Sequence, residues 1–387
     1  MLTLTLAALL SSNAHAQIVN PGPGLAIQDA IPVWNGFNFF WDDMNHRLQR
    51  LGAFVDVGSC TSLGCTADYV HAGASGTGDD VGNMTGRFTK IRTSAAGFED
   101  GTASFWVITT EGNTFSDTLT VEVPVPFNMR DKDKYVAVMN GFDLNMSDAV
   151  GEPIPDKLGE LHIDLSAVTY NTGTDTATFT ISVELLADCD SLECMEDLGW
   201  DNVVEYTLDI PWVLVAGNTG SFAYAVDAVN TDDAYAWDEY DSSLACSDLV
   251  PCPGNEIFIA DHTFSNTIDG ANNYQRGALA FRGIDVSLDS DEPDEGMYLW
   301  SLAMQTKDPT YTASTGTMTY DYTTFAKEWF AWDPWGAAFW SEGHAGDASL
   351  RAEVVLLQFA SGTVTTASTS ESWLQSSVTE VATDISF

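Results

Sequence analysis

The sequence predicts an all-β fold of two tandem β-sandwich or jelly-roll-like domains related by internal duplication. Three observations predict this fold. Segments rich in β-branched and aromatic residues follow one another along most of the chain, turn residues separate them, and two stretches of the chain resemble each other. Only Trp41–Arg50 and Lys327–Trp332 have patterns that allow a helical turn.

The predicted strands alternate with clusters of Gly, Asn, Asp and Ser, and hairpin turns are expected at 171–174 and 217–220. Some strands, Tyr206–Val215 among them, are apolar on both faces, which favours the interior of a sandwich. The predicted strands are Ala103–Thr110, Thr118–Val125, Tyr135–Met139, Glu160–Tyr170, Thr176–Leu186, Tyr206–Val215, Gly277–Leu288, Met297–Gln305, Thr317–Thr324 and Ala352–Phe359.

An internal repeat predicts the domain organisation. Tyr135–Asp148 resembles Gly277–Asp289, and Glu205–Gly217 resembles Arg351–Gly362, at a nearly constant offset. With 387 residues, the chain is also long for one hydrophobic core. We therefore expect a signal peptide over residues 1–16, one domain over 17–217 with an extra hairpin region around 84–127, and a second domain over 218–387.

The charge balance excludes whole classes of partner. Lys and Arg number 14 against 56 Asp and Glu, which gives a formal net charge of −42. Such a surface repels the phosphates of nucleic acids and anionic membrane surfaces, so neither is expected as a partner. Beyond the N-terminal leader, no run of about eighteen apolar residues predicts a membrane-spanning helix.

The N-terminus and the cysteines predict export. An apolar run, Leu2–Leu10, precedes an Ala14-His15-Ala16 cleavage site. Six cysteines form three close pairs around short loops, a spacing that favours local disulfides in an oxidising compartment over a metal site. We expect a secreted or cell-surface protein, with the periplasm as an alternative location. The predicted pairs are Cys60 with Cys65, Cys189 with Cys194, and Cys246 with Cys252.

Two acidic segments are candidate Ca²⁺ sites, and the sequence predicts either no cofactor or Ca²⁺. Crowded carboxylates repel one another, and a hard divalent cation with oxygen ligands relieves this repulsion. The spacing is not that of an EF-hand, and a solvated acidic loop without an ion is the alternative. The candidate ligands are Asp289, Asp291, Asp294 and Glu295 in the second domain, and Asp143, Asn145 and Asp148 in the first.

A dense aromatic segment allows two interpretations. Trp329, Trp332, Trp335 and Trp340 could stack on sugar rings, since flat indole faces suit them. They could instead be buried in a core or in a contact between subunits, where aromatic residues are common. We favour burial.

No motif for catalysis or cofactor binding is present, and we nominate no catalytic residue. HExxH, G-x-S-x-G, Walker and dinucleotide patterns are all missing from the sequence. We therefore expect a non-catalytic structural protein that self-associates as a subunit of an extracellular layer, filament or matrix. A glycan-binding module or polysaccharide-active secreted enzyme is the main alternative. An outer-membrane β-barrel is a weaker one, suggested by Val381 and Ile385 alternating before Phe387.

Overall fold

The all-β class is confirmed by the structure, a computed structural model. Nearly all described residues lie in antiparallel strands, and a single 3₁₀ turn, η1 (Phe127–Met129), interrupts them. Within this described part, no helix has the length and apolarity to span a membrane. The structure describes residues 15–19, 30–41, 47–61, 64–74, 81–110, 114–148, 158–187, 203–230, 257–267, 274–288, 296–306, 310–312, 317–331, 348–360, 364–376 and 379–386.

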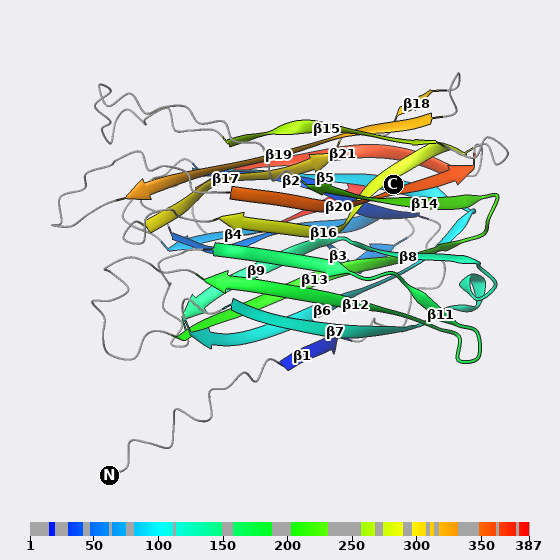
Figure 1. Cartoon of the computed structure of the whole chain (residues 1–387), viewed down its shortest axis with the longest axis horizontal. Coiled ribbons are helices and arrows are strands. Elements are labelled where there is room, and N and C mark those ends of the chain that lie inside the picture. The colour runs from blue at the N-terminus through cyan, green and yellow to red at the C-terminus, as the bar shows by residue number, and fades with distance from the viewer. Residues whose placement is uncertain are drawn as a thin grey trace, which may run out of the picture.

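Three antiparallel sheets, here named A, B and C, contain these strands (Figure 1). Sheet A has the order β1 (His15–Val19), β6 (Ala96–Thr110), β13 (Val203–Gly217), β9 (Gly141–Asp148), β3 (Arg47–Thr61), β4 (Gly64–Ala74) and β22 (Thr379–Ser386), with β8 (Lys134–Met139) also beside β13. Sheet B has the order β15 (Ile257–Thr267), β19 (Thr317–Ala331), β17 (Gly296–Thr306), β2 (Ala30–Trp41), β5 (Val81–Thr93) and β21 (Val364–Ser376), with β18 (Thr310–Thr312) beside β19. Sheet C has the order β11 (Thr169–Asn171), β12 (Thr176–Ala187), β10 (Leu158–Leu165), β16 (Tyr274–Leu288), β20 (Ala348–Ala360) and β14 (Phe222–Asn230), with β7 (Thr114–Pro124) beside β12.

The three sheets share one strand plan. Without β1, β8, β11 and β18, the order is β22-β4-β3-β9-β13-β6 in sheet A, β7-β12-β10-β16-β20-β14 in sheet C and β15-β19-β17-β2-β5-β21 in sheet B. Three consecutive strand sets fill these positions: a first set from β2 to β7, a second from β8 to β15 and a third from β16 to β22. Each set spreads over all three sheets. Equivalent strands of successive sets lie at the same position in different sheets: β2 in sheet B corresponds to β9 in sheet A and to β16 in sheet C. The chain is therefore built as three interleaved, pseudo-equivalent sets.

The residue pairing repeats along with the strand order. Trp34 pairs with Phe88 in sheet B, Met139 with Trp212 in sheet A, and Phe281 with Val354 in sheet C. Directly after each of these pairs the register shifts by one residue, and the extra residue is Asn35, Asn140 or Arg282. A second β-bulge also recurs, between β3 and β4, between β10 and β12, and between β17 and β19.

The structure thus divides the chain differently from the two domains that the sequence predicts. The matched segments Tyr135–Asp148 and Gly277–Asp289 become β8–β9 and β16, and both pair in the same register with β13 and β20. A third copy, Trp34-Asn35-Gly36-Phe37, occupies the same position in β2. Each sheet takes strands from both sides of the boundary predicted at 217, because the sets exchange strands. Inside the region 84–127, β6 pairs with β13 and β7 with β12, so these two strands do not form a hairpin.

Other local predictions have mixed outcomes. The hairpin turn expected at 171–174 is confirmed, because β11 and β12 pair on either side of it. A turn also lies at 217–220, but the hairpin expected there is wrong, because β13 lies in sheet A and β14 in sheet C. The pattern that allowed a helical turn at Lys327–Trp332 does not produce one in the described part of this segment, because β19 continues as a strand through Ala331. Pairing with β17 outweighs the weak helical pattern of this segment.

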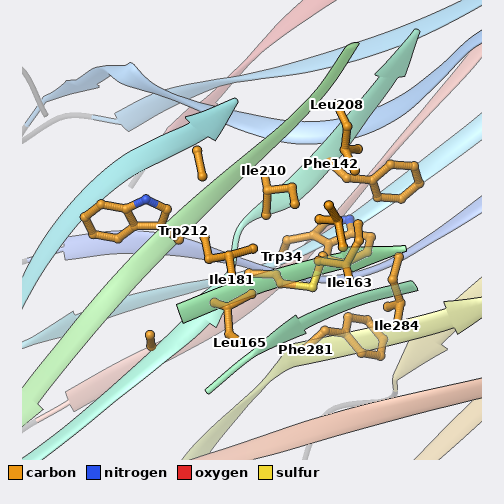
Figure 2. Close-up of a cluster of buried hydrophobic side chains, with 14 of the residues drawn as sticks. Trp34, Phe142, Ile163, Leu165, Ile181, Leu208, Ile210, Trp212, Phe281 and Ile284 are labelled. Atoms are coloured by element: carbon orange, nitrogen blue, oxygen red, sulfur yellow. The ribbon is translucent and has the colours of Figure 1, made fainter. Parts of the chain in front are cut away.

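The three sets meet in a shared interior. The equivalent strands β2, β8 and β16 approach one another pairwise, and Val33, Val138 and Ala280 on them belong to one fully buried cluster. A second, larger cluster lies between sheets and contains aromatic side chains from all three sets (Figure 2). In it the ring of Trp34 lies 6.0 Å from that of Phe142 and 5.0 Å from that of Phe281. Two buried clusters, each with residues from all three sets, therefore join the sets.

The bulge glycines give a direct test of this framework. Gly141 has φ +116°, and a Cβ there would lie 2.1 Å from the carbonyl oxygen of Ala53. At the equivalent Gly283 the closest atom, the carbonyl oxygen of Ile163, would lie 2.9 Å away. We expect Gly141→Ala to lower the free energy of unfolding by roughly 3 kcal/mol or more, because strain and clash add, and Gly283→Ala to lower it less. Urea denaturation measures both.

Gly173 provides the control, since a Cβ there would approach only the side chain of Asn171, at 3.3 Å. Gly173→Ala should be close to neutral. Equal losses at Gly141 and Gly173 would contradict the proposed role of the bulge.

Candidate functional site

All strands run between the same two ends of the molecule, which we call the near end and the far end. At the near end β7 leads through η1 into β8, and at the far end β9 and β12 finish (Figure 1). Of the described near-end connections, 94–95 between β5 and β6 and 218–221 between β13 and β14 are short turns, whereas 125–133, which contains η1, is longer. A site at the near end is therefore built from these turns, the η1 segment and the strand ends beside them.

A hollow of about 610 Å³ opens at the near end, within the size range of ligand sites. The segment after η1, the connection after β10, and strands β11 and β14 together form its wall. Its chemistry is unusual for so acidic a chain, because tyrosine rings and two ammonium groups dominate. The lining residues are Lys132, Asp133, Lys134, Tyr135, Val168, Tyr170 and Tyr224.

Asp175 holds the aromatic wall of this hollow in place. Its carboxylate accepts a hydrogen bond from the hydroxyl of Tyr170 at 3.1 Å, and it pairs with the guanidinium of Arg130 at 2.9 Å. Asp175 has φ +52°, and its carbonyl oxygen accepts a hydrogen bond from the N–H of Val125. The β11–β12 turn is therefore fixed to the segment that enters η1.

Two tyrosines stack to make the wall itself. The rings of Tyr135 and Tyr170 lie 4.6 Å apart with planes 23° from parallel, and the hydroxyl of Tyr135 donates to the carbonyl oxygen of Met129 at 2.7 Å. Burial, and next the nearby Tyr170, raise the pKa of Tyr135, while burial and the hydrogen bond to Asp175 raise that of Tyr170. Both phenols therefore stay neutral at physiological pH and add no negative charge to the hollow.

Cations and carboxylates alternate around the hollow: Lys132 and Lys134 lie beside Asp131 and Asp133, and Arg130 pairs with Asp175. Thr219 donates hydrogen bonds to Asp133, one of them from its backbone N–H at 2.7 Å, and this lowers the pKa of Asp133. Lys132 and Lys134 flank this single lining carboxylate. Nearby Phe127 is 82% exposed, the most exposed large apolar side chain among the described residues. Aromatic and cationic groups with one exposed apolar anchor form a composition typical of binding interfaces.

Other charged pairs join strands instead of lining a hollow. Arg50 on β3 bonds both carboxylate oxygens of Asp143 on β9, at 2.8 and 2.5 Å. In the equivalent place of the next set, Asp285 on β16 faces His162 on β10. The bulge residue Arg282 pairs with Glu353 on β20. These pairs hold the bulged strands together.

The residues predicted to bind Ca²⁺ are only partly described. Asp143 is buried and bonded to Arg50, so a cation there would have to displace a guanidinium. Asn145 is half-buried on β9, and Asp148 ends that strand. The second set, Asp289, Asp291, Asp294 and Glu295, lies outside the described residues. Within the described part, no group of three or more potential ligand side chains is positioned to hold a metal.

The predicted disulfides and the tryptophan segment stay predictions. Cys60 and Cys65 flank the paired residues Thr61 and Gly64 in the β3–β4 hairpin. Trp329 belongs to β19. Cys189, Cys194, Cys246, Cys252, Trp332, Trp335 and Trp340 lie outside the described residues.

Sequence reasoning missed the near-end hollow, although one signal for it exists. Arg130, Lys132 and Lys134 are three of the chain's 14 basic residues within five positions. The tyrosines give no such signal, because Tyr170 and Tyr224 join the site only through the pairing of distant strands.

No protein-family model, curated protein or solved structure matches this chain. The residues themselves therefore carry the functional argument.

Removing the guanidinium of Arg50 tests the role of the inter-strand pairs. Arg50→Ala would leave Asp143 buried and unpaired beside Asp209, whose pKa burial already raises. We expect a loss of about 3–5 kcal/mol in the free energy of unfolding, as for other broken buried pairs. The double variant Arg50→Ala/Asp143→Ala should recover part of this loss in urea denaturation. No recovery would contradict the pairing.

The His162–Asp285 pair predicts a pH dependence. The interaction with Asp285 raises the pKa of His162, and burial opposes this shift only in part. Because the folded pKa exceeds the unfolded value near 6.5, the stabilisation is complete below that value and disappears as pH rises through the folded pKa. The difference in unfolding free energy between the wild type and His162→Gln should thus be larger at about pH 5.5 than at about pH 8.5. A difference independent of pH would refute this assignment.

Proposed function

We propose that this protein is a non-catalytic, secreted or cell-surface structural protein, a subunit of an extracellular layer, filament or matrix. The observation that carries the proposal is the exchange of strands between the three sets. Every sheet contains strands from all three sets, so a set cannot move relative to its neighbours without breaking a complete row of backbone hydrogen bonds. Such a continuous framework suits a load-bearing subunit.

The acidic groups with raised pKa values do not favour catalysis. Burial, and next the charge of Asp100, raise the pKa of Glu99 to about 7, which is a useful value for a general acid or base. Glu99 and Asp100 are neighbours on β6, so their side chains point to opposite faces of the strand and do not converge on one substrate position. Glu353 has a raised pKa through burial and already pairs with Arg282.

A second candidate function is recognition of an anionic glycan at the near-end hollow. Tyrosine rings suit the apolar faces of sugars, and the two ammonium groups could pair with a uronate or sulfate. The same composition also suits a protein interface. Unlike self-association, this candidate gives no role to the shared-sheet framework.

Microscopy of the mature protein tests the structural role. We expect ordered assemblies in negative stain that grow as NaCl rises from about 10 to 150 mM, because screening shortens the Debye length from about 30 to 8 Å and weakens repulsion between copies of charge −42. Ca²⁺ at millimolar concentration should have the same effect at lower ionic strength. Dispersed monomers under all of these conditions would overturn the proposal.

A further inference from the structure

The two ends of the molecule differ strongly in charge. Nine connections begin and finish at described far-end strand ends, and their sequences hold half of the chain's 56 carboxylates but a single basic residue, Lys157. The connections themselves lie outside the described residues. They are 42–46, 75–80, 111–113, 149–157, 188–202, 231–256, 289–295, 332–347 and 377–378.

The near end holds much of the positive charge. Lys134 begins β8 at the hollow. Arg276 occupies the equivalent position on β16, where it pairs with Phe359, one residue before the end of β20. Arg92 lies near the same end of β5, and both Arg92 and Arg276 are exposed. These residues give all three sheets a cation at the near end, where Lys132 and Lys134 stand beside Asp133 and Arg130 pairs with Asp175. The two ends therefore differ in charge, because the far-end connections are almost purely acidic whereas the near end mixes cations with carboxylates.

We propose that the near-end hollow binds the acidic far end of a second copy of this chain, so that copies assemble head to tail. This inference rests on the proposed structural function and specifies its contact. Charge complementarity between Lys132, Lys134 and carboxylates favours this partner, since the far-end connections hold half of the chain's 56 carboxylates. A contact between two different surfaces does not close on itself unless the rotation between copies closes a ring, so it generates a polar filament.

The chemistry of the hollow fits such a contact at short range. Lys132 and Lys134 would meet carboxylates at contact distance, where salt near 0.15 M screens an attraction much less than it screens repulsion beyond about 8 Å. Phe127 and Tyr224, which are 82% and 37% exposed, would lose apolar surface to the partner. Tyr135 and Tyr170 are already fixed by their stacking and hydrogen bonds, so little side-chain freedom is lost on binding.

Mixing two assembly-deficient variants tests the head-to-tail contact. The near-end variant carries Phe127→Ser, Lys132→Gln and Lys134→Gln, and the far-end variant carries Asp289→Asn, Asp291→Asn, Asp294→Asn and Glu295→Gln. Each variant alone should be monomeric in light scattering, at concentrations at least tenfold above those where the wild type assembles. An equimolar mixture should form 1:1 dimers and no longer chains, because it has one intact near end and one intact far end per pair.

A charge-matched control separates this contact from general electrostatics. Ser116→Glu/Thr120→Glu changes the net charge by the same amount as the two lysine substitutions, on the exposed face of β7. This control should assemble like the wild type. Circular dichroism and urea denaturation must show that every variant is folded before its assembly is compared.

The remaining outcomes are distinct. Assemblies that persist in the near-end variant would overturn the head-to-tail contact and leave the structural role standing. Monomers from the wild type in all conditions would overturn the structural role itself. Binding of a hexauronate by the wild type but not by the near-end variant, with assembly unchanged, would assign the hollow to a glycan and overturn this inference.

Discussion

Antiparallel pairing between strands of different sets is the constraint on which the rest of this structure depends. Pairing register decides which face of a strand is buried, and a slip of one residue exchanges the two faces. At each bulge the extra residue, Asn35, Asn140 or Arg282, shifts the register by one, so the strand buries opposite faces before and after the bulge. Trp34 and Phe37, three positions apart, therefore enter the same cluster, while Val33 faces the interior shared by the three sets. One strand thus contributes to both cores.

The few cations of the chain have two kinds of surroundings, inside the sheets and at the near-end hollow. Arg50 and Arg282 are placed inside the sheets, where each compensates a carboxylate on a neighbouring strand next to a bulge. Leaving such a carboxylate unpaired costs far more than a surface ion pair gains, so these positions constrain the framework more strongly than the exposed acids do. Lys132 and Lys134 instead line the near-end hollow beside tyrosines, at and just before the start of β8. That difference in surroundings is the reason for assigning them to binding.

Local patterns predicted the strands well, and their arrangement poorly. Tyr135–Met139 and Thr176–Leu186 were predicted within a residue of β8 and β12, because alternation of apolar and polar residues reports the strand itself. The repeat between Tyr135–Asp148 and Gly277–Asp289 identified strands that do pair in one register. The sequence comparison did not find the third copy in β2. A bulge constrains only about four residues, and the sequence separation between Trp34 and Phe88 differs from that between the paired residues of the other two copies. Exchange between sheets leaves no local pattern, and neither does a hollow assembled from three separate segments.

The segregation of acidic residues at one end follows from where the sets pack against each other. At the near end, Ala95, Phe98 and Phe222 belong to the cluster shared by the three sets, so the turns there close directly over buried side chains. A Cβ at Gly217 would lie 2.4 Å from Phe222, so the turn from β13 to β14 passes directly over this cluster. An insertion into this turn would disturb the core, whereas the longest connections, 188–202, 231–256 and 332–347, join strand ends at the far end. Because these long connections are also rich in carboxylates, the distribution of acidic residues follows from which strand ends the core leaves free to carry longer sequence.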